Sequence, residues 1–409
     1  MAETKWETDK WFVSHLNYNE EVVAGLDLPE KIRIHDVTLR DGEQQAGLAF
    51  QKDEKIEIGR KLAEAGVHRI EAGMPAVHRK DAEAIKELAE MDLGGTQVFT
   101  FSRCMVDDID RAADLGVDGV VVEIPAGEKI LERCYGWSLD KAKGMSIEAT
   151  AHAKERGLYT VFFPIDATRA DLAWFLDLID DVSTQGHMDS LAIIDTFGVC
   201  SPHAIDYMVR KVKQRIDKPL EVHFHDDFGM GVANTIIGLA AGAEVAHVTV
   251  SAIGERAGNA ALEDVVLTLK TMYDRDCGVK TEMLYELSQL VRKVGNIPLR
   301  PNRPIVGDDT FRSESGIVAA WYLRCKDTFP CTLYPFRWDL VGRTEAELVY
   351  GKWCGRPTIE LGLRKMGAAA TDEQIMDIVM QVKDKGYDLK RRLTEAEFEE
   401  IAQAVIEGA

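Results

Sequence analysis

The feature that most constrains the fold of this sequence is a short apolar, β-branched run that recurs eight times in the first two-thirds of the chain. The stretches between these runs have the apolar periodicity of amphipathic helices. Strands that alternate with helices at a spacing of about 30 residues predict parallel βαβ units. The runs cover residues 32–37, 67–71, 97–101, 119–124, 159–163, 190–195, 220–225 and 245–251, and the helical stretches cover 53–65, 79–91, 107–115, 146–156, 170–184, 202–216 and 233–242.

Eight such units match the strand number of a closed (β/α)8 barrel. A doubly wound sheet is the alternative, but it seldom contains eight evenly spaced units, and no G-x-G-x-x-G motif follows the first run. We therefore predict an α/β fold built on a TIM barrel. In such barrels the functional site lies at the C-terminal ends of the strands, so the polar residues that follow the runs are the candidates for function.

The rhythm of strands and helices stops near residue 290. A Pro-rich stretch at 296–304 indicates a linker, and the segment after it is rich in aromatic residues without a βα repeat. Thr394 and Glu397 have the spacing of a capping box, which predicts the start of a helix. We therefore expect an N-terminal arm at 1–30, a catalytic barrel at 31–290, a linker and small α+β subdomain at 291–366, and a helical tail at 367–409.

Composition and charge narrow the class of protein. The net charge of −20 argues against nucleic acid or an anionic membrane as a partner. The chain has no apolar run of about 18 residues, and its N-terminus lacks the apolar segment of a signal peptide. The seven cysteines are scattered without C-x-x-C pairs, as in chains with reduced thiols. These features predict a cytoplasmic protein that acts on small molecules.

Two histidines at the end of the seventh run are candidates for metal binding. His223 and His225 are two residues apart, and on a strand this spacing places both imidazoles on one face. Two histidines near a carboxylate form a site suited to a divalent cation. An isolated H-x-H is more often a half-exposed strand end without a ligand. Here the position of the pair at the end of the seventh run of the eightfold repeat favours a metal site.

Several motifs occur in a fixed order along the chain and together are highly specific. They are DVTLRDGEQ at 36–44, IEAGMPA at 70–76, DTFG at 195–198, HFHDDFGMGVAN at 223–234 and GERAGNA at 254–260. With these motifs the chain resembles the isopropylmalate, homocitrate and citramalate synthases, whose wider family includes hydroxymethylglutaryl-CoA lyase. Further segments at 304–307, 315–317, 341–343 and 351–352 resemble the subdomain that follows the barrel in the synthases.

The resemblance implies a divalent-metal site in an enzyme that joins an acyl-CoA to a 2-oxo acid. Asp41, His223, His225 and Asn259 would hold Mg²⁺ or Mn²⁺, with Zn²⁺ as a further option. The ion would bind the keto and carboxylate oxygens of the 2-oxo acid. Arg40 would stabilise the oxyanion that forms when the keto carbon is attacked.

The same resemblance implies further site residues and the partners. Gln44 and Thr196 would bind the substrate carboxylate, and Glu71 and Arg103 would shape the pocket. Acetyl-CoA would be the co-substrate: its thioester would be enolised, would add to the keto carbon and would then be hydrolysed. In the related synthases the arm and the post-barrel subdomain are exchanged across a dimer, so we expect a homodimer.

Two positions depart from the synthase pattern. After the fifth run the synthases carry E-D-[AS]-x-R, but here Ile165 occupies the place of the glutamate, and isoleucine cannot move a proton. The synthases also carry S-G-I-H in the post-barrel subdomain, where this chain has Val318 in place of the histidine. The loss of both acid/base groups indicates altered chemistry or an altered substrate, and His35, Tyr135 and Cys200 are weak candidates to replace them.

Three functions remain open from the sequence. The first is a Claisen-type condensation of acetyl-CoA with an unusual 2-oxo acid. The second is a metal-dependent carbon–carbon lyase or aldolase acting on a 2-hydroxy or 2-oxo acid, although the loop after the eighth run lacks the catalytic cysteine of the lyase branch. The third is a non-catalytic, metal-binding relative. Thiol release from acetyl-CoA on adding 2-oxo acids would separate the first two, and bound metal without turnover would favour the third.

Overall fold

The structure is a computed structural model that describes residues 4–408. The chain forms two compact units. One is His15–Leu299, and the other combines the N-terminal residues up to Ser14 with the segment from Arg300 onward. None of the helices within residues 4–408 is both long enough and apolar enough to cross a membrane.

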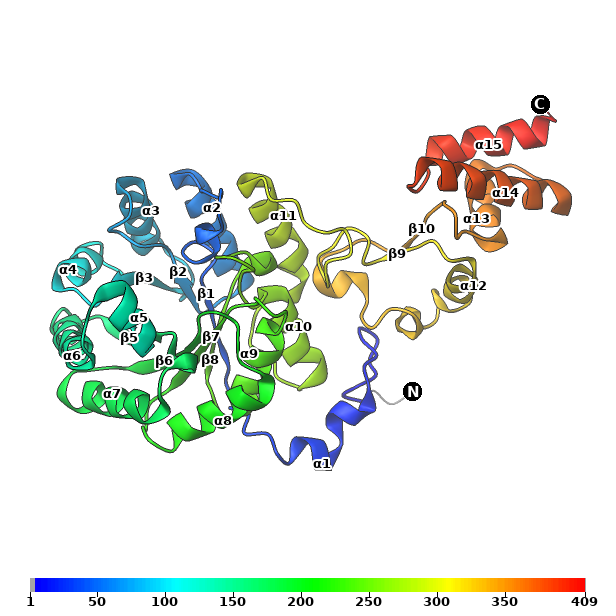
Figure 1. The fold of residues 1–409 in the computed structure, drawn as a ribbon. Helices are drawn as coiled ribbons and strands as arrows, with labels where there is room; N and C mark the ends of the chain where they lie inside the picture. Colours follow the sequence, from blue (N-terminus) through cyan, green and yellow to red (C-terminus); the bar gives the residue numbers. More distant parts are fainter. Residues whose placement is uncertain (1–3, 409) are drawn as a thin grey trace. The chain divides into compact units, whose positions relative to one another are not determined.

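Eight parallel strands close into a barrel inside a ring of helices (Figure 1), which confirms the predicted TIM-barrel fold. The strands pair in sequence order, and β1 closes the barrel against β8, with Arg33 opposite Val245 and Asp36 opposite Val248. The strands are β1 (Arg33–Asp36), β2 (Arg69–Glu71), β3 (Gln97–Arg103), β4 (Gly119–Pro125), β5 (Tyr159–Ile165), β6 (Ser190–Asp195), β7 (Leu220–Phe224) and β8 (Val245–Val248).

Several helices of the barrel unit begin directly after a residue whose side chain caps the first turn. Ser138, Asp171 and Ser201 each cap a helix, because their side chains accept hydrogen bonds from free backbone N–H groups in the first turn. The helices of this unit are α1 (Glu20–Val23), α2 (Lys52–Ala65), α3 (Arg79–Glu90), α4 (Val106–Asp114), α5 (Glu128–Ile130), α6 (Leu139–Glu155), α7 (Leu172–Gln185), α8 (Pro202–Lys213), α9 (Gly231–Ala240), α10 (Leu262–Met272) and α11 (Leu284–Gly295).

The barrel interior has an apolar half and a polar half. On the side of β1, β2, β7 and β8, the side chains of His35, Arg69, Glu221 and His247 are buried. On the side of β3 to β6 the core of the interior is apolar, and burying each large side chain there contributes about 1.5–3 kcal/mol. That apolar cluster consists of Phe99, Val121, Val161, Phe163, Ala192 and Ile194.

Three strands, β1, β7 and β8, end earlier than predicted from the sequence, and the ends of β7 and β8 shape the site. β7 ends at Phe224, because the backbone of His225 leaves the barrel ladder and forms an antiparallel bridge with Asn259. β8 ends at Val248, and Ser251 and Ala252 follow with φ angles of 61° and 58°, in the left-handed region. This turn directs the chain back across the mouth of the barrel, so that the backbone of Asn259 lies beside that of His225.

The second unit combines a short parallel ladder with helices. The predicted capping box is present, because Thr394 Oγ1 accepts from the backbone N–H of Glu397 at 3.2 Å and Glu397 Oε2 accepts from that of Thr394 at 2.8 Å. Ile378, Val382 and Phe398 belong to its buried core. Its elements are β9 (Arg312–Ser313), β10 (Glu347–Leu348), α12 (Gly316–Cys325), α13 (Arg356–Met366), α14 (Asp372–Leu389) and α15 (Glu395–Glu407).

The aromatic side chains after the linker are divided between a buried group and an exposed group. Phe311, Tyr322 and Tyr334 are buried, and the ring centres of Phe311 and Tyr334 lie 5.6 Å apart. Trp321 and Trp353 are exposed at 53% and 70%. The buried rings form the core of this region, whereas the two tryptophans present apolar surface to the outside.

Candidate active site

Four polar side chains meet at the mouth of the barrel. The Nε2 atoms of His223 and His225 lie 3.4 Å and 3.6 Å from Asp41 Oδ2. Asn259 Nδ2 donates to Asp41 Oδ1 at 2.8 Å. One ligand atom from each of Asp41, His223 and His225 lies within 4.8 Å of the others. The structure therefore brings together the four side chains that we predicted as metal ligands.

The donor set of this cluster suits a divalent cation. All four side chains are buried, and the Oδ1 atom of Asn259 has no hydrogen-bond partner. A buried acceptor without a partner costs about 1–3 kcal/mol, and a cation bound beside Asp41 would remove that cost. Oxygen and imidazole ligands without a thiolate fit Mg²⁺, Mn²⁺ and Zn²⁺ alike.

Hydrogen bonds beneath the cluster set the tautomer of His223. His247 Nε2 lies 2.6 Å from Glu221 Oε2, so this nitrogen donates to the carboxylate, and in the neutral ring His247 Nδ1 is an acceptor. His223 Nδ1 lies 3.4 Å from that acceptor, which places its proton on Nδ1 and leaves the lone pair of Nε2 facing Asp41. Burial lowers the pKa of His223 to about 3, so the ring is neutral. A neutral imidazole oriented in this way is ready to coordinate a metal.

Arg40 is held on several sides next to the cluster. Its Nε donates to Glu71, and its Nη1 donates to Asp41 Oδ2 at 2.9 Å and to Gln44 Oε1 at 3.2 Å. The guanidinium carbon lies 4.1 Å from the ring centre of Phe101. Nη2 is buried without a partner. Arg40 can therefore donate to an oxygen of a ligand without losing its protein partners.

Arg40 also controls the charge of the two carboxylates beside it. Burial alone would raise the pKa values of Asp41 and Glu71, but the Arg40 guanidinium acts in the opposite direction on both and is the largest of the lowering influences. The pKa of Asp41 is held well below its usual value, and the pKa of Glu71 is lowered to about 2. Both groups are ionised at neutral pH, as a metal ligand and an anchor for Arg40 require.

A second group of buried polar side chains lies in the barrel interior. His35, Glu221 and His247 also have ligand atoms within 4.8 Å of one another. However, Arg69 Nη1 donates to Glu221 Oε1 at 2.7 Å and already balances its charge. We therefore assign this group to the support of His223. Sequence analysis missed it, although Glu221 and His223 are two residues apart on one strand and so face the same side.

The side chains of Arg103 and Thr196 have partners other than the four predicted metal ligands. Arg103 forms a two-pronged ion pair with Asp108, with distances of 2.7 Å and 3.0 Å, and its side chain is 51% exposed. Thr196 Oγ1 accepts from the backbone N–H of Asp166 at 2.8 Å. The roles expected for both residues toward a substrate stay predictions.

One carboxylate near the end of β4 was missed by sequence analysis. Glu123 is half-buried, and burial raises its pKa to about 7, against the lowering effect of Arg40 and Arg103. The available signal was a single charged residue inside the apolar run 119–124. Ile165, which stands at the place of the synthase glutamate, ends β5 and packs against the apolar cluster of the interior.

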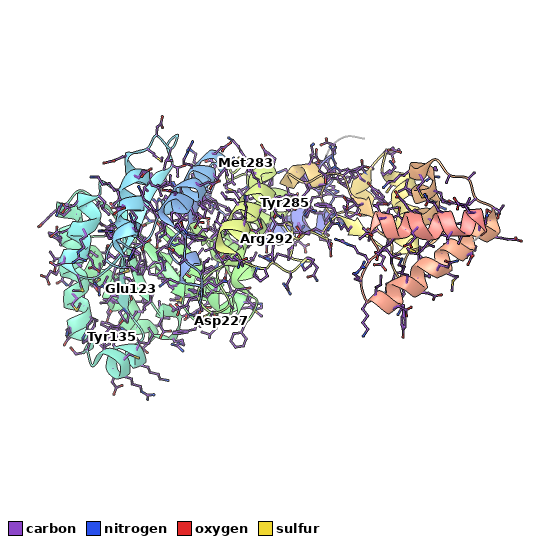
Figure 2. All side chains as sticks on the ribbon, turned by 90° about the horizontal axis from the view of Figure 1, so that it is seen from above. Glu123, Tyr135, Asp227, Met283, Tyr285 and Arg292 are labelled. Atoms are coloured by element: carbon purple, nitrogen blue, oxygen red, sulfur yellow. The ribbon has the colours of Figure 1, made fainter. Side chains whose placement is uncertain are left out.

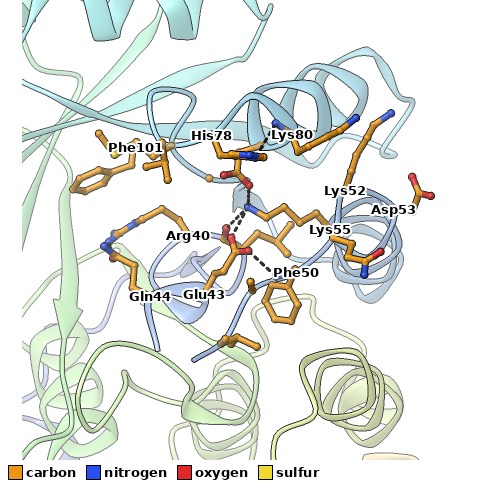
Figure 3. Close-up of a pocket in the computed structure, with 18 residues that line it drawn as sticks. Arg40, Glu43, Gln44, Phe50, Lys52, Asp53, Lys55, His78, Lys80 and Phe101 are labelled. Carbon is orange, nitrogen blue, oxygen red and sulfur yellow. Dashed lines mark hydrogen bonds and ion pairs between the residues drawn. The ribbon is translucent and has the colours of Figure 1, made fainter. Parts of the chain in front are cut away.

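A pocket opens beside Arg40 and Gln44 and has a volume of about 720 Å³. Figure 3 shows Phe101, Arg40 and Gln44 on one side of this pocket and Lys52 on the other. Its other lining residues come from the loop after β1, the loop after β2 and the starts of α2 and α3. The pocket therefore leads from the Arg40 side chain toward the outside of the barrel unit.

Comparison with known proteins identifies the family. Residues 31–291 match the model of the HMGL-like family. The chain belongs to this family. This HMGL-like protein is 40% identical to the "Probable 2-isopropylmalate synthase" of Ignicoccus hospitalis, over 93% of this chain and 94% of that protein. It is 36% identical to the homocitrate synthase of Methanopyrus kandleri, over 96% of each chain.

A solved structure shares the fold of this HMGL-like protein. The HMG-CoA lyase of Bacillus subtilis aligns with a TM-score of 0.59 and 22% identity, over 66% of this chain and 96% of that chain. At this identity the likeness concerns the fold alone. The resemblance to the synthase group that the ordered motifs predicted is confirmed by the family model and by the named relatives.

Proposed function

We propose that this protein catalyses the metal-dependent, Claisen-type condensation of an acyl-CoA, acetyl-CoA in the simplest case, with a 2-oxo acid. The observation that carries the proposal is the cluster of Asp41, His223, His225 and Asn259 directly beside the partly unoccupied guanidinium of Arg40. The relatives named as synthases of isopropylmalate and homocitrate support this reaction class.

The cluster would hold the cation, and Arg40 would act on the oxygen that gains charge. A bound divalent cation supplies Lewis-acid polarisation of the keto group. The free Nη2 of Arg40 donates to the keto oxygen as it becomes an alkoxide. The carboxylate of Glu71 and the ring of Phe101 fix the guanidinium, so little reorganisation is needed during the reaction.

Gln44 and Thr196 offer hydrogen-bond donors that match a substrate carboxylate. The Gln44 amide oxygen accepts from Arg40, and the Thr196 hydroxyl oxygen accepts from the Asp166 backbone. Within residues 4–408, neither the Gln44 amide N–H groups nor the Thr196 O–H donates to a protein acceptor. These donors are therefore free to bind the carboxylate of the 2-oxo acid, as the family resemblance implied.

The pocket beside Arg40 supplies a path for the thioester. Leu48, Phe50, Met74 and Val77 give it an apolar lining. Lys52 and Lys80 also line it and form partly exposed ion pairs with Glu87 and Glu83, which are weak enough for a phosphate group to replace. An apolar lining suits an acyl chain, and basic side chains suit the phosphate groups of a coenzyme A carrier. We place the acyl-CoA in this pocket, with its acyl end toward Arg40.

The test is a screen of 2-oxo acids with acetyl-CoA and Mg²⁺ or Mn²⁺, read by the release of free thiol. Release that needs both the acid and the metal supports condensation. Cleavage of 2-hydroxy acids without thiol release from acetyl-CoA would instead establish a lyase or aldolase. Stoichiometric metal binding without turnover of either kind would establish a non-catalytic relative.

A matched pair of variants ties the activity to the cluster. His223→Ala should lose metal, measured by elemental analysis, and should lose thiol release. His203→Ala, which alters an exposed histidine on α8, should change neither. Full metal occupancy in His223→Ala would contradict the ligand assignment.

A further inference from the structure

The side chain of Glu123 faces the interior of the barrel at its mouth. Val121 belongs to the buried interior cluster, and Glu123 follows it by two residues on β4, so both point to the same side of the sheet. In the barrel ladder Glu123 pairs with Arg103 of β3 and with Phe163 of β5. Figure 2 shows Glu123 among the elements of the barrel unit.

The Glu123 carboxylate has no partner that would hold it in a structural role. Within residues 4–408 it forms neither a hydrogen bond nor an ion pair, although it lies in the electrostatic field of Arg40 and Arg103. Arg103 is instead paired with Asp108. Tyr135 and Cys104 are the other ionisable groups that interact with its charge. A half-buried carboxylate without a partner at the mouth of a site is free to act on a bound molecule.

Glu123 is also placed to compensate for the apolar residue at the end of β5. Glu123 pairs with Phe163, and Pro125 pairs with Ile165, so Glu123 and Ile165 are diagonal neighbours on adjacent strands. Strands lie about 4.8 Å apart and rise about 3.3 Å per residue, which gives a Cα separation of roughly 8 Å. Both residues lie on the interior face, so a carboxylate from position 123 enters the same space as one from position 165.

The other residues considered from the sequence are less suitable. Burial lowers the pKa of His35 to about 4 and confines this ring to the polar layer of the interior. Burial raises the pKa of the Cys200 thiol to about 11, so it is protonated at neutral pH. Tyr135 is 47% exposed, and burial together with the charge of Glu123 raises its pKa further above that of a free phenol.

We infer that Glu123 is the general base of the condensation, an assignment that rests on the reaction proposed above. A Glu123 oxygen takes a proton from the methyl carbon of the acetyl thioester. The electron pair of that C–H bond forms the new bond to the keto carbon, and the keto π pair moves to the oxygen, where Arg40 stabilises it. The proton passes from Glu123 to this alkoxide, which restores the carboxylate. Water then cleaves the thioester to a carboxylate and a thiol.

The charge state of Glu123 fits this role near neutral pH. Burial raises its pKa to about 7, and Arg40 and Arg103 limit the rise. A base works best when its pKa lies close to the working pH. Because the reactive form is the carboxylate, kcat should increase as the pH rises through the pKa of Glu123 and should level off above it.

Variants at position 123 test the assignment directly. Glu123→Gln keeps the shape of the side chain and should lower kcat by about 10²–10⁴-fold, the usual contribution of a general base. It should also lose the rise of kcat with pH and the metal-dependent exchange of the acetyl-CoA methyl protons with D₂O. Added formate should restore part of the activity of Glu123→Ala. Glu132→Gln, on an exposed residue of the following turn, should behave as wild type.

An infrared pH titration of the metal-free protein provides a readout that does not depend on turnover. The wild type should show two carboxyl groups that lose their protons near pH 7, because burial raises the pKa of both Glu123 and Asp36 to about 7. Glu123→Gln should lose one of these signals, and Asp36→Asn should lose the other. A Glu123 that ionises near pH 4, or a Glu123→Gln variant with wild-type kcat and exchange, would overturn the assignment.

The outcomes separate this inference from the proposed function. If Glu123→Gln still releases thiol at the wild-type rate, the proposed condensation is supported, and the assignment of Glu123 as its base is wrong. If the wild type exchanges the methyl protons of acetyl-CoA but does not condense it with a 2-oxo acid, and Glu123→Gln loses the exchange, Glu123 is confirmed as a base and the proposed condensation is wrong. A wild type that neither condenses nor exchanges overturns both.

Discussion

Replacing Arg40 by lysine tests whether this side chain acts on the transition state or only holds the fold. Arginine has five N–H donors. Three of them serve Glu71, Asp41 and Gln44, and the two on Nη2 have no partner. A lysine carries three N–H groups on a single nitrogen. It can keep the positive charge beside Asp41 and Glu71, but it cannot also reach the position of Nη2.

The structure sets the size of the expected effect. Arg40→Lys loses the donor to the developing oxyanion, which typically costs about 10²–10³ in kcat, or roughly 3–4 kcal/mol. Because one cation remains beside two buried carboxylates, folding and metal content should be largely kept. Arg40→Gln removes that cation as well, and breaking a buried pair costs about 3–5 kcal/mol of stability. The glutamine variant should therefore also unfold at lower denaturant.

The assay measures kcat and KM by thiol release, together with metal content and the denaturation midpoint. Arg111→Lys, an exposed exchange on α4, is the matched control and should match wild type in all four quantities. A kcat of Arg40→Lys close to that of wild type would show that Arg40 is only a structural ion pair, and our account of its free Nη2 would be wrong.

Three further predictions concern assembly, the altered positions and pH. The chain should be a homodimer, because Ile317 and Trp321 lie one turn apart on α12 and are 65% and 53% exposed, which leaves an apolar face for a second copy to cover; a monomeric mass in light scattering at micromolar concentration would contradict this. Ile165→Glu combined with Val318→His should not raise kcat/KM on 2-oxoisovalerate, 2-oxoglutarate or pyruvate, since a second carboxylate would raise the pKa of its neighbour; brisk wild-type turnover of any of them would remove the case for altered specificity. Burial raises the pKa of Asp36 to about 7 although Thr38 donates to it. Its protonated form therefore stabilises the fold at acid pH, and that contribution declines by about 1.4 kcal/mol per pH unit between about pH 4 and pH 7. Relative to wild type, Asp36→Asn should gain stability over that window in urea unfolding, and a constant difference would refute the raised pKa.

The fold was predictable from the sequence because strand and helix periodicities are local. The strands near 97–101, 119–124 and 190–195 occur where their apolar runs lie. The ends of β7 and β8 were not predictable in this way, since they depend on the bridge between His225 and Asn259, which are far apart in sequence. Tertiary pairing decides where such strands stop.

The candidate site was predictable where a motif marked it and was missed where only burial and distance reveal it. The motif that contains Asp41 and the motif that contains His223 and His225 predicted that these side chains lie close together at the mouth of the barrel, as they do in the structure. Glu123 belongs to no motif, and its importance comes from the register between β3, β4 and β5. The ion pair that occupies Arg103 is likewise visible only once the helix after β3 is in place.

The ion pair between Arg69 and Glu221 has a consequence for how the barrel folds. Arg69 lies on β2, Glu221 lies on β7, and 152 residues separate them in sequence. A half-barrel that ended after β4 would lack Glu221, and covering its inner face without that carboxylate would leave Arg69 as an uncompensated buried charge, at a cost of about 3–5 kcal/mol. The pair therefore makes closure of the barrel cooperative, and it opposes any stable half-barrel intermediate. Contacts of such long range also form late and slowly, so fragments of this barrel should gain structure only when both halves are mixed.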